Sequence, residues 1–181
     1  MRSQIFQKKN SRSFTPVFLA IVVLMNSALA HGAGNIVPNI RMGMASDKFT
    51  DTYELAAVFE LEAPTFLHAR RAEIAIGSIS TSQESAAFMS FGPVWRLPAW
   101  NEKMFLDIGF SPTILSGSTF NGRDAGGNFH FTSSLSIGAK LGRNETGSIA
   151  LRIQHMSNGG LNNTNPGLDM VGLEFSFGMS R

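Results

Sequence analysis

An alternation of apolar and polar side chains with a period of two recurs along most of the chain, and it constrains the fold more than any other feature. Residues 129–141 show it best: apolar residues share one face, with Ser133 among them, and polar or small residues fill the other. The same pattern occurs at 53–61, 106–110 and 171–177, and in weaker form at 40–44, 72–76, 87–95 and 149–153. Because helical periodicity is nearly absent, the pattern predicts an all-β chain with eight strands.

The spacing of these segments predicts how the strands connect. Counted from one turn to the next, each predicted strand is roughly 9–13 residues long, about the length that a tilted strand needs to cross a bilayer. Turn-forming residues lie between them, at 46–51, 64–68, 78–83, 98–103, 116–128, 142–147 and 158–168. Since such connections favour neighbouring antiparallel strands, we expect an eight-stranded antiparallel up-and-down β-barrel.

The two faces of the strands bear on whether this barrel is soluble or transmembrane. A soluble barrel places its charges outside, whereas a transmembrane barrel has an apolar exterior and a polar interior. The charged face carries only one or two charges per strand among small residues; they are Arg41, Glu54, Glu60, Arg71, Glu73, Asp107, Lys140, Arg152 and Glu174. A narrow interior with paired charges explains this sparseness better than a water-facing surface does. We therefore favour a transmembrane barrel, with a secreted lipocalin-like carrier as the alternative.

Aromatic residues near the predicted strand ends fit the interfacial girdles of a transmembrane barrel. They are Tyr53, Trp95, Trp100, Phe120 and Phe129. We expect these side chains to lie at the two membrane–water boundaries.

The first 30 residues have the pattern of a secretory signal peptide. The segment has a basic start, an apolar centre at 16–25 and small residues at a cleavage site; the basic residues are Arg2, Lys8, Lys9 and Arg12, and the site is Ala28-Leu29-Ala30. An apolar run of about ten residues is too short to span a bilayer as a helix. Without this segment 11 basic and 13 acidic residues remain, so the pI of 9.3 gives no reason to expect nucleic-acid binding. We expect a signal peptide at 1–30 and the barrel at 31–181.

One stretch near the end of the sequence combines residue types that can perform catalysis. His155 and Ser157 are two residues apart at the end of a predicted strand, so their side chains project from the same face as Ile153. On the following strand, Asp169 shares its face with Val171 and the apolar residues beyond it. A histidine beside a serine can act as its general base, and a carboxylate can orient the imidazole. These three polar residues are therefore a candidate catalytic triad on the apolar, outward face of the barrel.

Turn residues around this stretch can supply hydrogen-bond donors. The backbone N–H groups and side-chain amides of Asn158, Gly160 and Asn165 lie near Ser157 in the sequence and could stabilise an oxyanion. Asparagine and glycine are also ordinary turn formers, so the same residues fit a plain exposed loop. The chain contains no cysteine, and the other histidines, which are His31, His68 and His130, show no metal-ligand spacing. We therefore expect neither a metal ion nor a cofactor.

The order of these residues resembles the active-site signature of the outer-membrane lipid A 3-O-deacylase (PagL) family. The signature is carried by His155-x-Ser157-Asn158, followed by Gly160, Asn165, Gly167 and an acid at position 169. The resemblance implies an eight-stranded barrel that hydrolyses the ester-linked acyl chain at position 3 of lipid A in the outer leaflet. It also implies His155 as the base, Ser157 as the nucleophile and Asp169 as the orienting acid, with Asn158, Gly160 and Asn165 near the oxyanion. The family acid that we expect is Glu. Because Asp169 is one methylene shorter, we expect its contact with His155 to be longer or water-bridged.

The predicted topology is compatible with this site. If both chain ends are periplasmic, the seventh strand runs outward and carries His155 and Ser157 to the level of the outer leaflet. We therefore expect an outer-membrane serine esterase with lipid A or lipopolysaccharide as its substrate and outer-membrane lipids around it. A homodimer is a further option, and nucleic acid is not an expected partner. The alternative is a non-enzymatic structural or adhesion barrel, in which residues 155–169 are only an exposed loop.

Overall fold

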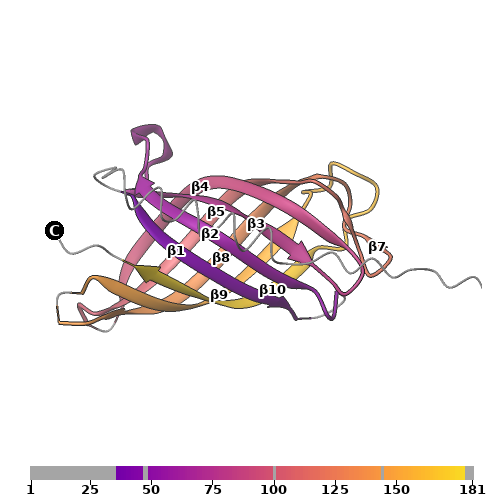
Figure 1. Ribbon diagram of the computed structural model, residues 1–181. Coiled ribbons are helices and arrows are strands. Elements are labelled where there is room, and N and C mark those ends of the chain that lie inside the picture. The colour runs from indigo at the N-terminus through magenta and orange to yellow at the C-terminus, as the bar shows by residue number, and fades with distance from the viewer. Residues whose placement is uncertain (1–35, 47–48, 100, 144, 178–181) are drawn as a thin grey trace, which may run out of the picture.

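A computed structural model describes residues 36–46, 49–99, 101–143 and 145–177. The predicted signal peptide, residues 1–30, lies outside the described residues. Within them, eight long strands form one closed barrel (Figure 1); they are β1 (Val37–Ala45), β2 (Tyr53–Glu62), β3 (Arg71–Ser80), β4 (Ser85–Ala99), β5 (Met104–Leu115), β8 (Phe129–Leu141), β9 (Gly147–Ser157) and β10 (Leu168–Phe177). A 3-10 helix, η1 (Thr65–Leu67), follows β2, and two short strands, β6 (Thr119–Phe120) and β7 (Arg123–Asp124), pair with each other.

The connectivity confirms the predicted all-β, eight-stranded antiparallel up-and-down barrel. Each long strand pairs antiparallel with the next long strand along the chain, and β1 closes the barrel by pairing with β10. Residues 49–52, 81–84, 116–128 and 158–167, which lie in the connections between strands, are all at the end of the barrel away from Val37 and Phe177, which we call the distal end (Figure 1). Among the described residues, no helix is long and apolar enough to cross a membrane.

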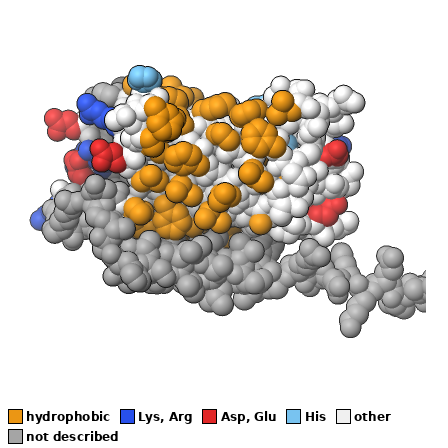
Figure 2. Space-filling view, turned by 90° about the horizontal axis from the view of Figure 1, so that it is seen from above, with side chains coloured by type: hydrophobic (Ala, Val, Ile, Leu, Met, Phe, Trp, Pro, Cys, Tyr) orange, Lys and Arg blue, Asp and Glu red, His pale blue; other side chains and the backbone are white. Residues whose placement is uncertain are grey.

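The outer wall of the barrel is apolar, and this settles which face of each strand points outward. Met42 and Leu151 are exposed, whereas the adjacent Arg41 and Arg152 are buried inside. Figure 2 shows a band of hydrophobic side chains across the middle of one face, between charged side chains at the two ends. An apolar exterior around a charged interior is the arrangement of a transmembrane barrel and the reverse of a soluble lipid carrier.

The charges that point inward pair with one another, as the narrow lumen requires. The Arg41 Nη2 atom lies 2.8 Å from Glu73 Oε2 and 2.7 Å from Glu174 Oε2, and Arg152 Nη1 lies 3.5 Å from the same Glu73 oxygen. A second group joins Arg71 to Glu60 and Asp107, and Arg96 also pairs with Asp107. Opposite charges in contact offset much of the cost of removing each from water.

Replacing Arg41 with alanine is expected to destabilise the barrel by about 3 kcal/mol, because it leaves the buried carboxylates of Glu73 and Glu174 with only their longer ion pairs to Arg152, at 3.5 and 3.7 Å. The measurement is the free energy of unfolding in urea, with the protein refolded into lipid vesicles. Lys140→Ala is the control: its ion pair with Glu145 is about one-third exposed and is worth about 0–1 kcal/mol. Equal losses in the two variants would contradict a structural role for the internal charges.

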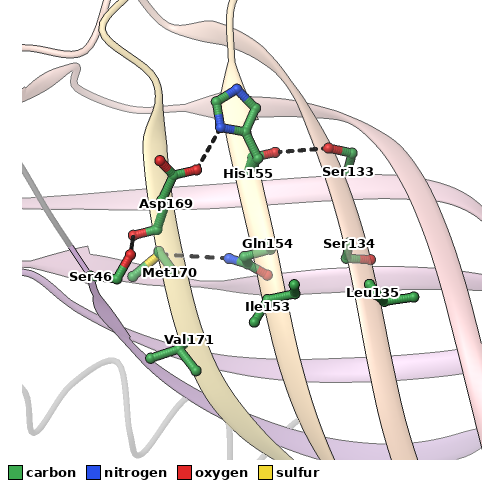
Figure 3. Close-up of a pocket in the computed structure, with 10 residues that line it drawn as sticks. All are labelled: Ser46, Ser133, Ser134, Leu135, Ile153, Gln154, His155, Asp169, Met170 and Val171. Carbon is green, nitrogen blue, oxygen red and sulfur yellow. Dashed lines mark hydrogen bonds and ion pairs between the residues drawn. The ribbon is translucent and has the colours of Figure 1, made fainter.

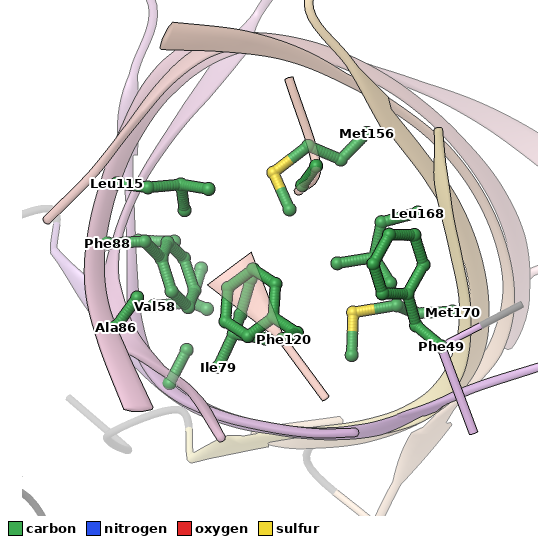
Figure 4. Close-up of a cluster of buried hydrophobic side chains, with 13 residues drawn as sticks. Phe49, Val58, Ile79, Ala86, Phe88, Leu115, Phe120, Met156, Leu168 and Met170 are labelled. Atoms are coloured by element: carbon green, nitrogen blue, oxygen red, sulfur yellow. The ribbon is translucent and has the colours of Figure 1, made fainter. Parts of the chain in front are cut away.

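The lumen is not polar along its whole length, which corrects the expectation from the strand faces. At the distal end, buried apolar side chains from the barrel strands and the connections meet inside the barrel (Figure 4), and they include Phe49, Ile79, Leu115, Phe120, Met156, Leu168 and Met170. Phe120 was expected in an aromatic girdle, but it is fully buried and packs edge-on against Phe49. The β6–β7 hairpin folds over the barrel mouth and carries Phe120 inward. Tyr53, Trp95 and Phe129 are exposed on the outer wall, and Trp100 lies outside the described residues.

Strands β3 and β4 extend two or three residues into the segments 78–83 and 98–103, which were predicted to be turns. Strand β3 continues to Ser80 because the turn is placed later, where the Thr81 hydroxyl accepts hydrogen bonds from the N–H groups of Gln83 and Glu84. Strand β4 continues through Pro98 to Ala99. Its pairing with β3 ends at Val94, so the later residues pair on one side only, where a missing N–H is tolerated.

Candidate active site

The last hairpin of the barrel brings His155 and Asp169 together. They are directly opposite each other in the β9–β10 register, and the Nδ1 atom of His155 lies 2.6 Å from Oδ1 of Asp169. Both side chains stand on the outward face, about half exposed. The expectation of a longer or water-bridged contact is therefore wrong: directly paired strand residues have their Cβ atoms only about 4.5–5.5 Å apart, which an aspartate can bridge.

The contact to Asp169 fixes how the imidazole faces its surroundings. With Nδ1 engaged by the carboxylate, the other ring nitrogen, Nε2, points along the strand away from Ile153, the direction in which β9 continues to Ser157 (Figure 3). Ser157 is the last residue of β9, lies on the same face, and is paired with Phe131 of β8. Among the described hydrogen bonds, none joins His155 to Ser157. Hydrogen bonds between catalytic residues are often long before the substrate binds, so the missing His155–Ser157 hydrogen bond is compatible with His155 as the general base of Ser157.

The loop after Ser157 is held from inside by Asn158. This side chain is fully buried; its Nδ2 donates to the carbonyls of Gly126 and Thr164 at 2.8 and 2.7 Å, and its Oδ1 accepts the N–H of Gly160 at 2.9 Å. The backbone N–H of Asn158 donates to Oδ1 of Asn165 at 3.1 Å. The predicted oxyanion donors therefore differ in whether they are free to bind a substrate. Asn158 and Gly160 donate to carbonyl and amide oxygens of the loops, whereas the Nδ2 of Asn165 has no described partner and its side chain is exposed.

A second loop at the distal end supports the first. The Gly126 carbonyl in the β5–β8 connection also accepts from Nδ2 of Asn162 at 2.5 Å. The shape of this connection depends on Asp124, whose carboxylate accepts the N–H groups of Gly126 and Gly127 and the Ser118 hydroxyl. These hydrogen bonds, first of all that from Gly126, hold the pKa of Asp124 below its usual value. The residues after Ser157 are thus anchored to a neighbouring loop.

Gly167 lies against the imidazole and has no room for a side chain. Its φ is +70°, and a Cβ built on it would be 2.7 Å from Cε1 of His155. The sequence signature contains this glycine, and the structure shows the reason for it: a side chain at position 167 would occupy the space of the His155 ring.

Gly167→Ala is expected to lower the catalytic rate by about 100-fold, because the added methyl group displaces the His155 ring. Gly122→Ala is a matched control, since that glycine has a φ of +71° and open space around its Cβ position. Both variants carry similar backbone strain, so comparing their activity and thermal unfolding separates strain from displacement of the ring. Equal activity in the two variants would exclude a specific contact between Gly167 and His155.

Two contiguous grooves lie on the outer wall, and His155 and Asp169 line the first of them. The first has a volume of about 510 Å³. Its polar lining residues nearer the distal end include Ser46, Ser133, His155 and Asp169, and its apolar lining residues nearer the middle of the barrel are Leu135, Ile153 and Val171 (Figure 3). The second, of about 590 Å³, crosses β2, β1, β10 and β9; its apolar side chains are Met42, Met44, Tyr53, Leu55, Leu151, Val171 and Leu173. Val171 belongs to both, so a polar site and an apolar trough are contiguous. Among the described residues, no group of three His, Asp or Glu side chains lies close enough to hold a metal ion.

The fold and the position of the pair define a class: transmembrane-type β-barrels whose acid–imidazole pair lies on the outer wall rather than in the lumen. Within that class, the chain belongs to the lipid A 3-O-deacylase (PagL) family, whose profile matches residues 51–178. Members of this family are described as lipid A deacylases, which are ester hydrolases.

Two known proteins illustrate the relationship. The lipid A deacylase PagL of Bordetella bronchiseptica (strain ATCC BAA-588 / NCTC 13252 / RB50) is 31% identical over 93 residues, which are 48% of this chain and 51% of that protein. The match thus spans about half the length of this curated relative. The crystal structure of the outer membrane enzyme PagL superposes with a TM-score of 0.60 at 18% identity, covering 79% of this chain and 99% of that chain. The latter likeness supports the fold.

Proposed function

We propose that this protein is an outer-membrane lipid A 3-O-deacylase that works through Ser157, His155 and Asp169. The observation that carries the proposal is the 2.6 Å contact between His155 and Asp169 on the lipid-facing wall, with Ser157 two residues further along the same face. Ionisable groups on a lipid-facing surface are costly and usually have a function. Membership of the deacylase family indicates which ester they act on.

In the proposed mechanism, the Ser157 hydroxyl attacks the ester carbonyl carbon of the acyl chain. His155 Nε2 takes the hydroxyl proton, and Asp169 holds the proton on Nδ1 and stabilises the imidazolium. The C–O bond to the sugar then breaks, and His155 returns its proton to the leaving sugar oxygen. Water, deprotonated by the same nitrogen, then attacks the acyl carbonyl carbon. The bond to Ser157 Oγ breaks, His155 returns the proton to that oxygen, and the fatty acid is released.

For the oxyanion we assign Asn165 as the donor and Asn158 and Gly160 as support. Oδ1 of Asn165 accepts the backbone N–H of Asn158, the residue directly after the nucleophile, and this fixes the amide while leaving Nδ2 available. Asn158 and Gly160 keep the loop in place through their own hydrogen bonds. A fixed amide beside the reacting carbonyl stabilises the charge that develops on its oxygen.

The position of the site explains how a membrane lipid would reach it. His155 and Asp169 lie near the distal end, and the contiguous apolar groove runs from there toward the middle of the outer wall. A lipid with its ester at His155 can place its acyl chain along Val171 and Leu173 without leaving the membrane. Entry by lateral diffusion requires no opening of the barrel, whose distal interior is filled by apolar side chains.

Mass spectrometry of lipid A tests this proposal. The purified protein, in mixed detergent–lipopolysaccharide micelles, is expected to remove one ester-linked acyl chain and release the corresponding fatty acid. The position of the lost chain is read from fragmentation of the product. Intact lipid A after prolonged incubation with the wild-type protein would reject the esterase in favour of a non-enzymatic barrel, and loss of an acyl chain from a different position would reject the 3-O assignment.

A further inference from the structure

Ser133 is a polar residue on an apolar wall, beside the proposed catalytic pair. It lies on the outward face of β8, between Phe131 and Leu135, and its side chain is exposed. In the register of β8 and β9 it is directly opposite His155. His155 therefore stands between Asp169 on one side and Ser133 on the other (Figure 3).

The Ser133 hydroxyl is poorly satisfied by the protein. Its one described hydrogen bond is to the His155 carbonyl at 3.5 Å, at the outer limit for such a contact. The His155 carbonyl lies in the paired strand β9, so a long hydrogen bond from Ser133 adds little to the stability of the protein. A hydroxyl among apolar groups carries a free-energy cost unless it finds a stronger partner.

The groove indicates what that partner would be. Ser133 lines the same 510 Å³ groove as His155 and Asp169, at the same height along the barrel. Two residues further along each strand, toward the middle of the barrel, the groove is lined by Leu135, Ile153 and Val171. An occupant of this groove must place oxygen atoms beside Ser133 and His155 and an alkyl chain beside the three apolar residues. An ester lipid with a polar headgroup has this distribution.

We propose that the Ser133 hydroxyl donates a hydrogen bond to an oxygen atom of the headgroup of the ester lipid, next to the ester that Ser157 attacks. Ser133 is thus a substrate-binding residue, which holds the headgroup beside His155 on the β8 side while the acyl chain lies over the apolar residues of the groove. This inference rests on the proposed esterase function and adds to it a residue that the sequence signature does not contain.

Two substrates separate this role from a structural one. With lipid A in mixed micelles, Ser133→Ala is expected to raise KM about 3- to 10-fold, the value of one hydrogen bond, with kcat within about twofold of the wild type. With a p-nitrophenyl alkanoate, which has no sugar headgroup, the same variant is expected to match the wild type. Ser133→Thr keeps the hydroxyl on a residue suited to strands and should restore KM for lipid A. Ser82→Ala, which removes an exposed hydroxyl in the β3–β4 turn, is the control and should leave both reactions unchanged.

The result that would overturn the inference is an unchanged KM for lipid A, or equal losses with both substrates, since damage to His155 would affect every ester.

Binding gives a test that does not depend on turnover. Lipid A affinity is compared between Ser157→Ala and Ser157→Ala/Ser133→Ala, and a 3- to 10-fold weaker affinity is expected in the double variant. Equal affinities would reject the role of Ser133 even if the wild type proved inactive, whereas an inactive wild type with weaker binding in the double variant would reject only the esterase.

Discussion

Replacing Ser157 with alanine is expected to lower the rate of lipid A deacylation by about 10⁴-fold or more, because it removes the atom that attacks the ester. The fold should be unaffected. Ser157 is the last residue of β9, and no described side-chain hydrogen bond depends on its hydroxyl. The loop that follows is held by Asn158, whose contacts with Gly126 and Thr164 remain in the variant.

The measurement is the initial rate of fatty-acid release, together with thermal unfolding of each variant. His155→Ala is expected to show a similar loss, and the Ser157→Ala/His155→Ala double variant little more than either alone, since residues that act in one step are not additive. Ser82→Ala serves as the folded, active reference. A Ser157→Ala protein that retains more than about one-tenth of wild-type activity would exclude Ser157 as the nucleophile and direct attention to another hydroxyl.

The barrel could be predicted from the sequence because the alternation of side chains is a direct record of the two faces of each strand. The segment 129–141 shows this, since its apolar positions lie on the outer wall and its small polar ones inside. The same alternation placed His155, Ser157 and Asp169 on one face, and the structure puts the first and last of these in contact. The prediction for the site depends only on residues of the β9–β10 hairpin, whose two strands are close together in the sequence.

What the sequence left open depends on register and on loops. The alternation places Ser133 on an apolar face, but its position opposite His155 follows from the β8–β9 register, which the alternation alone does not give. Phe120 looked like a girdle residue because it precedes a strand, and only the fold of the β6–β7 hairpin turns it into the barrel. In the same way, the sequence identifies Asn158 as a possible donor, while its burial and three hydrogen bonds identify it as an anchor.

Replacing Asp169 with alanine is expected to lower the rate of lipid A deacylation by about 10²-fold, clearly less than the loss in Ser157→Ala, since removing the orienting acid of a triad costs less than removing the nucleophile. The carboxylate takes no part in bond formation; it selects the tautomer of His155 with the proton on Nδ1 and stabilises the imidazolium. Its side chain is about half exposed, so its electrostatic effect is weaker than that of a buried carboxylate. The backbone should be unaffected, because the hydrogen bond from Ser46 N–H to the Asp169 carbonyl does not involve the side chain.

The asparagine variant tests the same contact without changing its shape. In Asp169→Asn the amide keeps the size of the carboxylate but loses the charge, and its NH₂ group can donate to Nδ1 and so favour the tautomer that cannot accept a proton on Nε2. We therefore expect Asp169→Asn to be no more active than Asp169→Ala, and Asp169→Glu to retain more activity than either, since a carboxylate remains at that position. The rates are measured with lipid A and with a p-nitrophenyl ester, and the losses should be parallel because Asp169 acts through His155 on every substrate. An Asp169→Ala variant as inactive as Ser157→Ala would instead show that the carboxylate is indispensable, and losses confined to lipid A would identify it as a contact to the headgroup.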